Sequence, residues 1–144
     1  MIDLGQMEMD VIELSSEVAN FINDEVKNFD KSKIEHKNSP NNLVSYVDKE
    51  AEKKLVKALR LILPGAGFLA EEGTSSEGSN EYRWIIDPLD GTTNFTHGLP
   101  PYAVSIGLSK KDKIVLGVVH EVSKMECFSA TVDGPASCNG EEIH

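Results

Sequence analysis

The order of hydrophobic patterns along the chain constrains its fold most strongly. Apolar residues recur at helical spacing from Met7 to Phe29, and again from about Val47 to Leu63. The tetrapeptide Ser-Tyr-Val-Asp at 45–48 matches a capping box, which predicts the start of the second helix, and Pro64-Gly65 predicts its end. Strand-like segments follow these helices. This order predicts an α+β fold, a layered sandwich in which two N-terminal helices pack on a largely antiparallel sheet.

The strand-like segments are short runs rich in apolar and β-branched residues, at 68–70, 83–87, 102–109, 113–120 and 126–131. Lys-Lys-Asp at 110–112 predicts a hairpin between two of them. Asn139-Gly140 is a hairpin turn signal with four residues after it, which is little sequence for a return strand. We therefore expect residues 1–144 to be the front portion of a longer polypeptide.

The charge balance narrows the classes of partner. The 144 residues include 24 acidic and 14 basic side chains, a formal net charge of −10. A field of that sign repels nucleic acids and anionic lipids, and no apolar run is long enough to span a bilayer. The acidic N-terminus lacks the basic start of a secretory signal, so we expect a cytoplasmic location. An acidic protein can still bind a phosphorylated substrate if bound cations reverse the local charge.

The cysteines and histidines indicate neither a disulfide framework nor a zinc site. Cys127 and Cys138 form no Cys-x-x-Cys motif, and the histidines at 36, 97, 120 and 144 lack metal-ligand spacing. We expect two reduced thiols.

A polar segment at 30–42 holds a proline and the lysines 31, 33 and 37. It predicts a long loop, either a solvated surface segment or a mobile lid over an anionic ligand.

The stretch WIIDPLDGTTNF, residues 84–95, carries the densest chemistry. It begins as a strand, which we expect to end at Pro88 because proline cannot donate to a sheet ladder. Side chains at positions i and i+3 of an extended strand point to opposite faces, but a bend at the proline can bring Asp87 and Asp90 together. Two carboxylates and the backbone carbonyl of Leu89 are hard oxygen ligands, which suit Mg²⁺.

Gly91-Thr92-Thr93 predicts a short helix-like turn directly after these carboxylates. Free N–H groups at such a turn bind anions, and a carboxylate pair beside an anion cradle suits metal-assisted hydrolysis of a phosphate ester. The same residues can also form an ordinary capped turn. An EF-hand is disfavoured because position 12, counted from Asp87, is Gly98 rather than glutamate.

Glu71 and Glu72 follow a strand-like run and have two readings. Adjacent acids in a loop are usually solvated surface residues. With Asp87 and Asp90 they would supply four carboxylates, enough to offset the charge of two divalent ions.

These motifs together resemble the inositol monophosphatase family. The resemblance is carried by WIIDPLDGTTNFTHGLPPYAVSIGL and, in order, by AEEG and VSYVDKEAE upstream and GVVHEVSKMECFSATVDG and CNG downstream, so it covers nearly the whole chain. Fructose bisphosphatases and bisphosphate nucleotidases share the D-P-x-D-G-T core, but Thr93-Asn94-Phe95 resembles the inositol monophosphatase branch. The resemblance implies the front half of an α/β/α/β/α fold.

The resemblance implies a site for two or three Mg²⁺ ions, with Mn²⁺ as a substitute. Glu71, Asp87 and the Leu89 carbonyl match the ligands of the first ion, and Asp87 and Asp90 match ligands of the second. Glu71 also contacts the environment of the water-activating ion, which implies a catalytic role.

The resemblance also implies how substrate and water are held. Gly91 and Thr92 match the groups that bind the phosphate, and Thr92 and Asp48 match the pair that orients and deprotonates the attacking water. For Asp48 the alternative is an acid in the first turn of a helix. The residues expected to line the substrate phosphate are Glu71, Leu89, Asp90, Gly91 and Thr92.

The implied function is hydrolysis of myo-inositol monophosphate, or a similar small polyol phosphate, by a metal-activated water attacking in line. The alternatives are a bisphosphate nucleotidase, a fructose-1,6-bisphosphatase, or a non-catalytic metal-binding module. The resemblance also implies lithium sensitivity and a homodimer in the full-length form. Family members are nearly twice as long, and their W-D-x-A-x-G motif is missing here, so we expect little or no turnover from residues 1–144 alone.

Overall fold

The computed structural model describes residues 2–28, 40–70, 75–76 and 79–143. The helices are α1 (Leu4–Asn28), α2 (Pro40–Ile62) and α3 (Thr92–Thr96), and the strands are β1 (Ala66–Ala70), β2 (Ser75–Ser76), β3 (Ser79–Asp90), β4 (Ala103–Lys110), β5 (Lys113–Glu121), β6 (Glu126–Thr131), β7 (Ser137–Cys138) and β8 (Glu141–Glu142). The described strands form one sheet in the order β2-β1-β3-β4-β5-β6-β7-β8, in which β1 and β3 are parallel and all other neighbours antiparallel.

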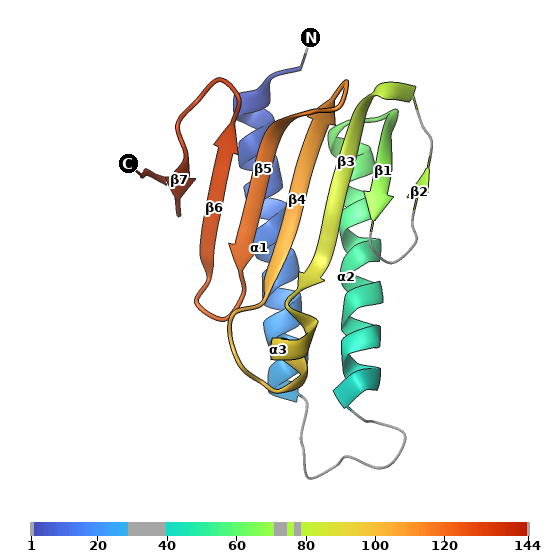
Figure 1. The fold of residues 1–144 in the computed structure, drawn as a ribbon, viewed down its shortest axis with the longest axis vertical. Helices are drawn as coiled ribbons and strands as arrows, with labels where there is room; N and C mark the ends of the chain where they lie inside the picture. Colours follow the sequence, from blue (N-terminus) through green and yellow to red (C-terminus); the bar gives the residue numbers. More distant parts are fainter. Residues whose placement is uncertain (1, 29–39, 71–74, 77–78, 144) are drawn as a thin grey trace.

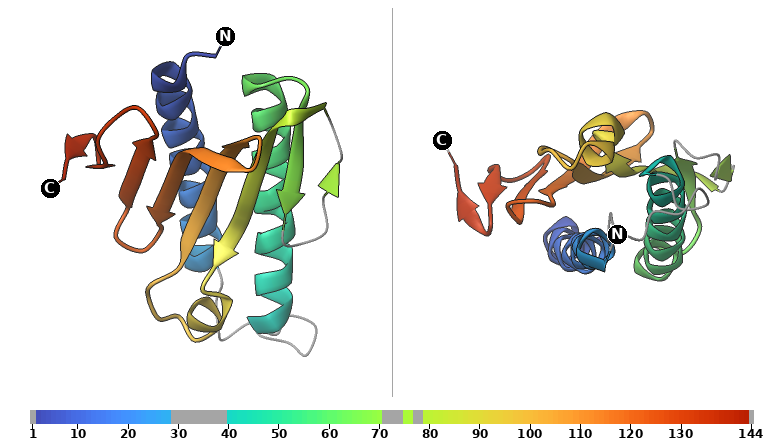
Figure 2. Two further views of the ribbon diagram at one scale, coloured as in Figure 1. Left: turned by 45° about the horizontal axis from the view of Figure 1, so that its top comes forward. Right: turned by 90° about the horizontal axis from the view of Figure 1, so that it is seen from below.

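Both long helices lie on the same face of this sheet (Figures 1 and 2). The core fills the space between the two layers, with Trp84, Leu55, Leu59 and Ile22 among its largest fully buried side chains. Amphipathic helices bury their apolar stripe in this way, and the sheet buries one face. The α+β layered sandwich predicted from the sequence is confirmed.

The second helix begins earlier than the sequence predicts. α2 starts at Pro40, so Ser45 lies inside the helix and the capping-box prediction is wrong. Proline suits a first helical position because its missing N–H would have no partner there. Asp48 therefore lies in the helix interior, and its alternative reading as a first-turn acid is also wrong. The end of α2 at Ile62, before Pro64, agrees with the prediction.

β3 does not end at Pro88, contrary to the sequence prediction, but continues to Asp90. Ile86 is the last residue of β3 that pairs with β1, so beyond that residue β3 pairs with β4 alone. The ladder with β4 shifts register between Asp87 and Asp90, as at a β-bulge. Proline is tolerated at bulges and at unpaired strand edges, where no ladder hydrogen bond is lost.

The C-terminal turn signal does form a hairpin. Asn139 and Gly140 both have positive φ, 51° and 84°, as a type I′ turn requires, and they join the two-residue strands β7 and β8. The Asn139 side chain also accepts a hydrogen bond from the Cys127 N–H at 2.8 Å, which ties the turn to β6. Cys127 and Cys138 are both free thiols, as expected.

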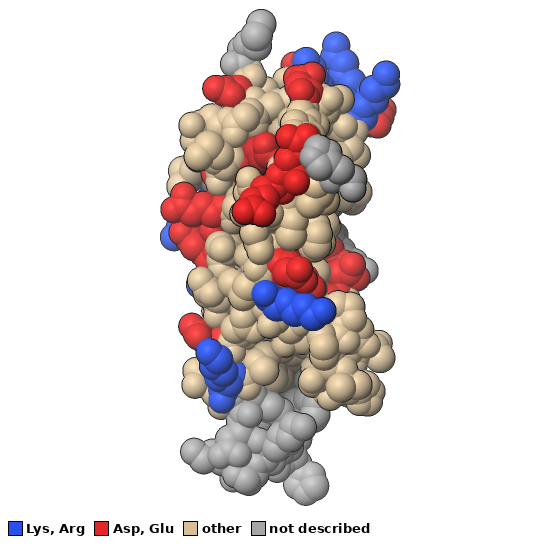
Figure 3. All heavy atoms as spheres, turned by 90° about the vertical axis from the view of Figure 1, so that its left-hand side faces the viewer, with Lys and Arg blue, Asp and Glu red and all other residues tan. Residues whose placement is uncertain are grey.

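Acidic side chains dominate the side of the molecule on which β6 and β7 lie (Figure 3). This distribution agrees with the net charge of −10. Of the described helices, none is long and apolar enough to cross a bilayer.

The sheet face opposite α1 and α2 is largely uncharged along its central strands. Paired residues across the sheet point to the same side, so Leu69, Ile85, Gly107, Gly117 and Ala130 form one row on this outer face. In the next row, Val119 and Phe128 are 43% and 40% exposed. Among the described helices only short α3 lies near this face, at its rim (Figure 2).

A buried polar cluster joins α1 to the sheet. The Ser15 hydroxyl donates to the Ile12 carbonyl at 2.7 Å, so it accepts from His120 Nδ1, 3.2 Å away. This assigns the proton of neutral His120 to Nδ1, and Nε2 is buried without a hydrogen-bond partner among the described residues. Burial lowers the pKa of His120, although the charge of Glu121 partly opposes this shift.

The first prediction concerns the outer face. We expect residues 1–144 to self-associate through it, because exposed apolar sheet surface favours pairing with a second molecule. Replacing Val119 and Phe128 together by lysine is expected to reduce the mass measured by light scattering. Leu61→Lys, on the helical face and 78% exposed, is the control and should leave the mass unchanged. A wild-type chain that remains monomeric at high concentration would contradict the prediction.

The second prediction concerns acid stability. The pKa of His120 is lower in the folded than in the unfolded chain, so folding favours the neutral ring. The stability that depends on neutral His120 is fully present above about pH 6.5 and is lost as the pH drops below it. The thermal unfolding midpoint should therefore fall from pH 8 to 5.5, by about 2–8 °C per kcal/mol lost. His120→Gln should reduce this fall, whereas His97→Asn, at an exposed position, should not. Equal falls in wild type and His120→Gln would show that another group is responsible.

Candidate active site

The two aspartates of the central motif lie on the same face of the sheet. Asp87 pairs with Ser105 and Asp90 with Ala103, and these partners are two residues apart on β4. Side chains two residues apart on a strand share a face, so the register shift cancels the opposite orientation expected for positions i and i+3. This register agrees with the part of the sequence hypothesis that puts both carboxylates on one side, and their joint binding of a metal stays a prediction.

The segment between the aspartates is anchored in the core. The Leu89 side chain is only 1% exposed, and its N–H donates to Asp87 Oδ1 at 3.3 Å. Asp87 is half-buried and Asp90 is exposed. The buried leucine holds the bulge in place while both flanking carboxylates stay within reach of solvent. The role of the Leu89 carbonyl as a metal ligand stays a prediction.

Gly91 turns the chain from β3 into α3. Its backbone is left-handed, with φ 89° and ψ 38°, a conformation that costs glycine little. A Cβ at this position would also lie 2.8 Å from the Pro101 carbonyl oxygen, so only glycine fits. The Phe95 N–H donates to the Gly91 carbonyl at 2.9 Å, which closes the first turn of α3. The helix-like turn predicted here is confirmed, and Thr92 and Thr93 lie exposed on it.

Asp48 lies on α2, the helix of the inner layer that contacts α3. α2 contacts α3, and the first turns of α2 lie beside it at the bottom of Figure 1. Asp48 is 6% exposed, and Glu52, one helical turn later, is 7% exposed. Glu52 is not among the site residues predicted from the sequence, although its spacing of four residues from Asp48 could have indicated a shared helix face.

The remaining predicted ligand lies outside the described residues. Glu71 and Glu72 fall between 70 and 75, and lysines 31, 33 and 37 of the predicted loop fall between 28 and 40. Within the described ranges, no three His, Cys, Asp or Glu side chains gather closely enough to hold a metal. Asp87 and Asp90 fit Mg²⁺ in kind, because both offer hard oxygen donors, and they require further ligands.

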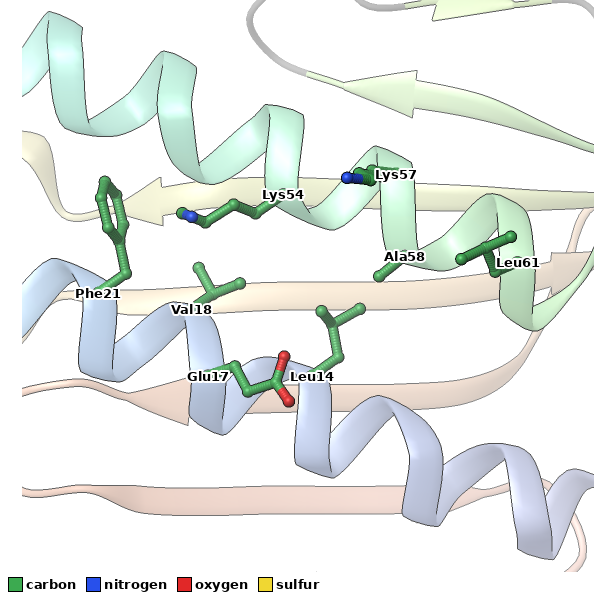
Figure 4. Close-up of a pocket in the computed structure, with 8 residues that line it drawn as sticks. All are labelled: Leu14, Glu17, Val18, Phe21, Lys54, Lys57, Ala58 and Leu61. Atoms are coloured by element: carbon green, nitrogen blue, oxygen red, sulfur yellow. The ribbon is translucent and has the colours of Figure 1, made fainter.

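A separate groove of about 290 Å³ lies between α1 and α2 (Figure 4). Its floor is apolar, and Lys54 Nζ lies 4.9 Å above the centre of the Phe21 ring. Glu17 is the one carboxylate among the residues that line it. This groove therefore lacks the paired carboxylates that the motif at the end of β3 provides.

Comparisons with known proteins agree on one family. The family model described as inositol monophosphatase matches residues 4–144. Over 105 residues the chain is 42% identical to inositol-1-monophosphatase of Mesorhizobium japonicum, and over 103 residues 44% identical to Nus factor SuhB of Pseudomonas aeruginosa. These matches cover 72% and 69% of this chain, but only 40% and 38% of the two relatives.

Solved structures give the same result. The extragenic suppressor protein SuhB of Bartonella henselae superposes with a TM-score of 0.81 at 30% identity, covering 98% of this chain and 53% of that one. Inositol monophosphatase II of Staphylococcus aureus gives 0.79 at 26% identity, covering 93% of this chain and 49% of that one. The chain thus spans about half the length of these two structures and less than half the length of the two curated relatives. On the match over residues 4–144, this chain belongs to the inositol monophosphatase family.

Proposed function

We propose that this chain carries the metal- and phosphate-binding part of a Mg²⁺-dependent phosphomonoesterase acting on a small polyol monophosphate. The observation that carries the proposal is the register shift in β3, which turns Asp87 and Asp90 to one face directly before Gly91-Thr92. Family membership supports it, because relatives of 42% and 39% identity are named inositol-1-monophosphatase and inositol monophosphatase 1.

In this proposal each residue has a defined task. Asp87 and Asp90, together with Glu71 and the Leu89 carbonyl, hold divalent ions. A bound Mg²⁺ would supply charge to activate water and to stabilise the leaving oxygen.

Thr92 and Asp48 act on the attacking water. The exposed Thr92 hydroxyl orients it, and Asp48 accepts its proton through that hydroxyl. General-base assistance of this kind requires a carboxylate within hydrogen-bond reach in the substrate complex. The buried position of Asp48 on α2, which contacts α3, supports this arrangement.

Two candidates exist for the alcohol portion of the substrate. A relative from Thermotoga maritima, 37% identical over 110 residues, is named fructose-1,6-bisphosphatase/inositol-1-monophosphatase, so a sugar bisphosphate is the second candidate. A panel of inositol 1-phosphate, fructose 1,6-bisphosphate and a nucleoside 3′,5′-bisphosphate would separate the candidates. We further propose a cytoplasmic enzyme that is a homodimer in its full-length form.

The third prediction concerns metal binding. Asp87→Asn is expected to weaken Mg²⁺ and Mn²⁺ binding by about 10–100-fold or more, since Asp87 is proposed as a ligand of both ions. Isothermal titration measures this change, and Ca²⁺ should compete without supporting turnover. Asp133→Asn, an exposed aspartate beyond β6, is the matched control. Identical Mg²⁺ titrations of wild type and Asp87→Asn would rule out the assigned site.

The fourth prediction concerns the water. In a version extended to the length of the relatives, Thr92→Ala should lower kcat by about 10²–10⁴-fold and leave Mg²⁺ affinity nearly intact. Thr93→Ala, at the neighbouring exposed threonine, is the control and should keep most of the activity. Wild-type kcat in Thr92→Ala would remove Thr92 and Asp48 from the mechanism.

A further inference from the structure

The position of Gly91 depends on a backbone segment that the motif itself does not contain. A Cβ on Gly91 would lie 2.8 Å from the Pro101 carbonyl oxygen and 3.3 Å from Tyr102 Cα. The turn that carries Asp90 and Thr92 therefore rests directly on residues 101–102. If residues 101–102 moved toward the turn, they would displace Gly91. If they moved away, Gly91 would lose these contacts.

Side chains from two different elements hold this support. Asn94, on α3, donates from Nδ2 to the Pro101 carbonyl at 2.9 Å. Glu121, at the end of β5, accepts from the Tyr102 N–H through Oε1 at 3.4 Å. The Tyr102 carbonyl in turn accepts from the Val122 N–H at 2.9 Å, so both backbone groups of Tyr102 are tied to the end of β5.

Glu121 is itself held rigidly. Its carboxylate accepts from the Ser123 hydroxyl at 2.6 Å and from the N–H groups of Ser123 and Lys124 at 3.2 Å and 2.7 Å. Burial would raise the pKa of Glu121, but these hydrogen bonds outweigh burial and lower it. An ionised carboxylate that accepts several bonds has little freedom to leave its position.

The aromatic ring of Tyr102 adds a third contact to the same turn. It meets the ring of Phe95, on α3, edge to face with 5.2 Å between ring centres. Phe95 is the residue whose N–H closes the turn onto the Gly91 carbonyl. The chain of contacts from Glu121 through Tyr102 therefore reaches both ends of the Gly91–Phe95 turn.

From these contacts we infer that Glu121 is a positioning residue of the site, acting through Tyr102 and Pro101 on Gly91, with Asn94 as the second clamp. Glu121 itself touches neither phosphate nor metal in this scheme. The inference rests on the proposed function, because the turn it positions is the proposed phosphate cradle.

The test compares Glu121→Ala with Glu121→Gln in the 144-residue chain. Titration of inorganic phosphate in the presence of Mg²⁺ should show about tenfold weaker phosphate binding for Glu121→Ala, with a smaller loss of Mg²⁺ affinity because Asp90 borders the same turn. Glu121→Gln should recover most of the phosphate binding, because the amide oxygen can still accept from the Tyr102 N–H, although the NH2 group cannot accept from the Lys124 N–H. Glu126→Ala is the matched control, since Glu126 pairs with Glu121 one strand farther from Tyr102.

Amide hydrogen exchange separates this inference from the proposed function. Glu121→Ala and Asn94→Ala should each speed exchange at Tyr102 and Phe95 by about tenfold or more, while exchange in the core of α1 stays unchanged. Absence of phosphate binding in the wild type would overturn the proposed function. The exchange data would still show whether Glu121 and Asn94 hold residues 101–102 in place. Unchanged exchange at both amides, or a uniform rise across the whole chain, would overturn the positioning role.

Discussion

The register of β3 is the constraint on which the rest of the structure depends. Trp84 and Ile86 must point toward the helices, because they fill the core, and Ile85 and Asp87 consequently point to the outer face. A slip of one residue would exchange these two sets and bury a carboxylate. The bulge after Asp87 adds a second condition: it buries Leu89 while turning Asp90 to the side of Asp87. Core packing and candidate chemistry are therefore set by one strand.

The candidate site lies where the end of β3 meets α3 and the N-terminal half of α2. β3 supplies the carboxylates, α3 supplies the exposed threonines, and α2 brings Asp48 from the helical layer. Sites built in this way are held by packing on several sides, which gives the reacting groups defined positions. The support under Gly91 follows the same logic, since Glu121 is contributed by the far end of a hairpin.

The two faces of the sheet differ in which side chains are buried and which are exposed. The inner face is covered by α1 and α2 and contains the polar cluster around His120, whose hydrogen bonds are partly satisfied. The outer face presents glycine, alanine and exposed aliphatic side chains, and Asp87 lies in one of its rows. The carboxylate pair thus borders an uncharged surface, and any molecule that packs on this surface lies next to the pair.

Several features of this protein follow from the sequence alone because their causes are local. Periodicity located α1 and most of α2, short apolar runs and turn residues located β1, β4, β5, β6 and part of β3, and Asn139-Gly140 formed the turn that its backbone preferences favour. The motif at 84–95, with its neighbours, was sufficient to identify the family.

Other features were decided by contacts between distant residues. The sequence could not show that β3 passes through Pro88, because this depends on which edge of the strand stays unpaired. The start of α2 at Pro40 and the burial of Glu52 depend on how the helix meets the sheet and α3. The hydrogen bond between the Tyr102 N–H and Glu121 joins residues that lie 19 positions apart, on opposite sides of a hairpin. Local preference determines which elements form, but only tertiary packing brings specific side chains of separate elements within hydrogen-bond reach.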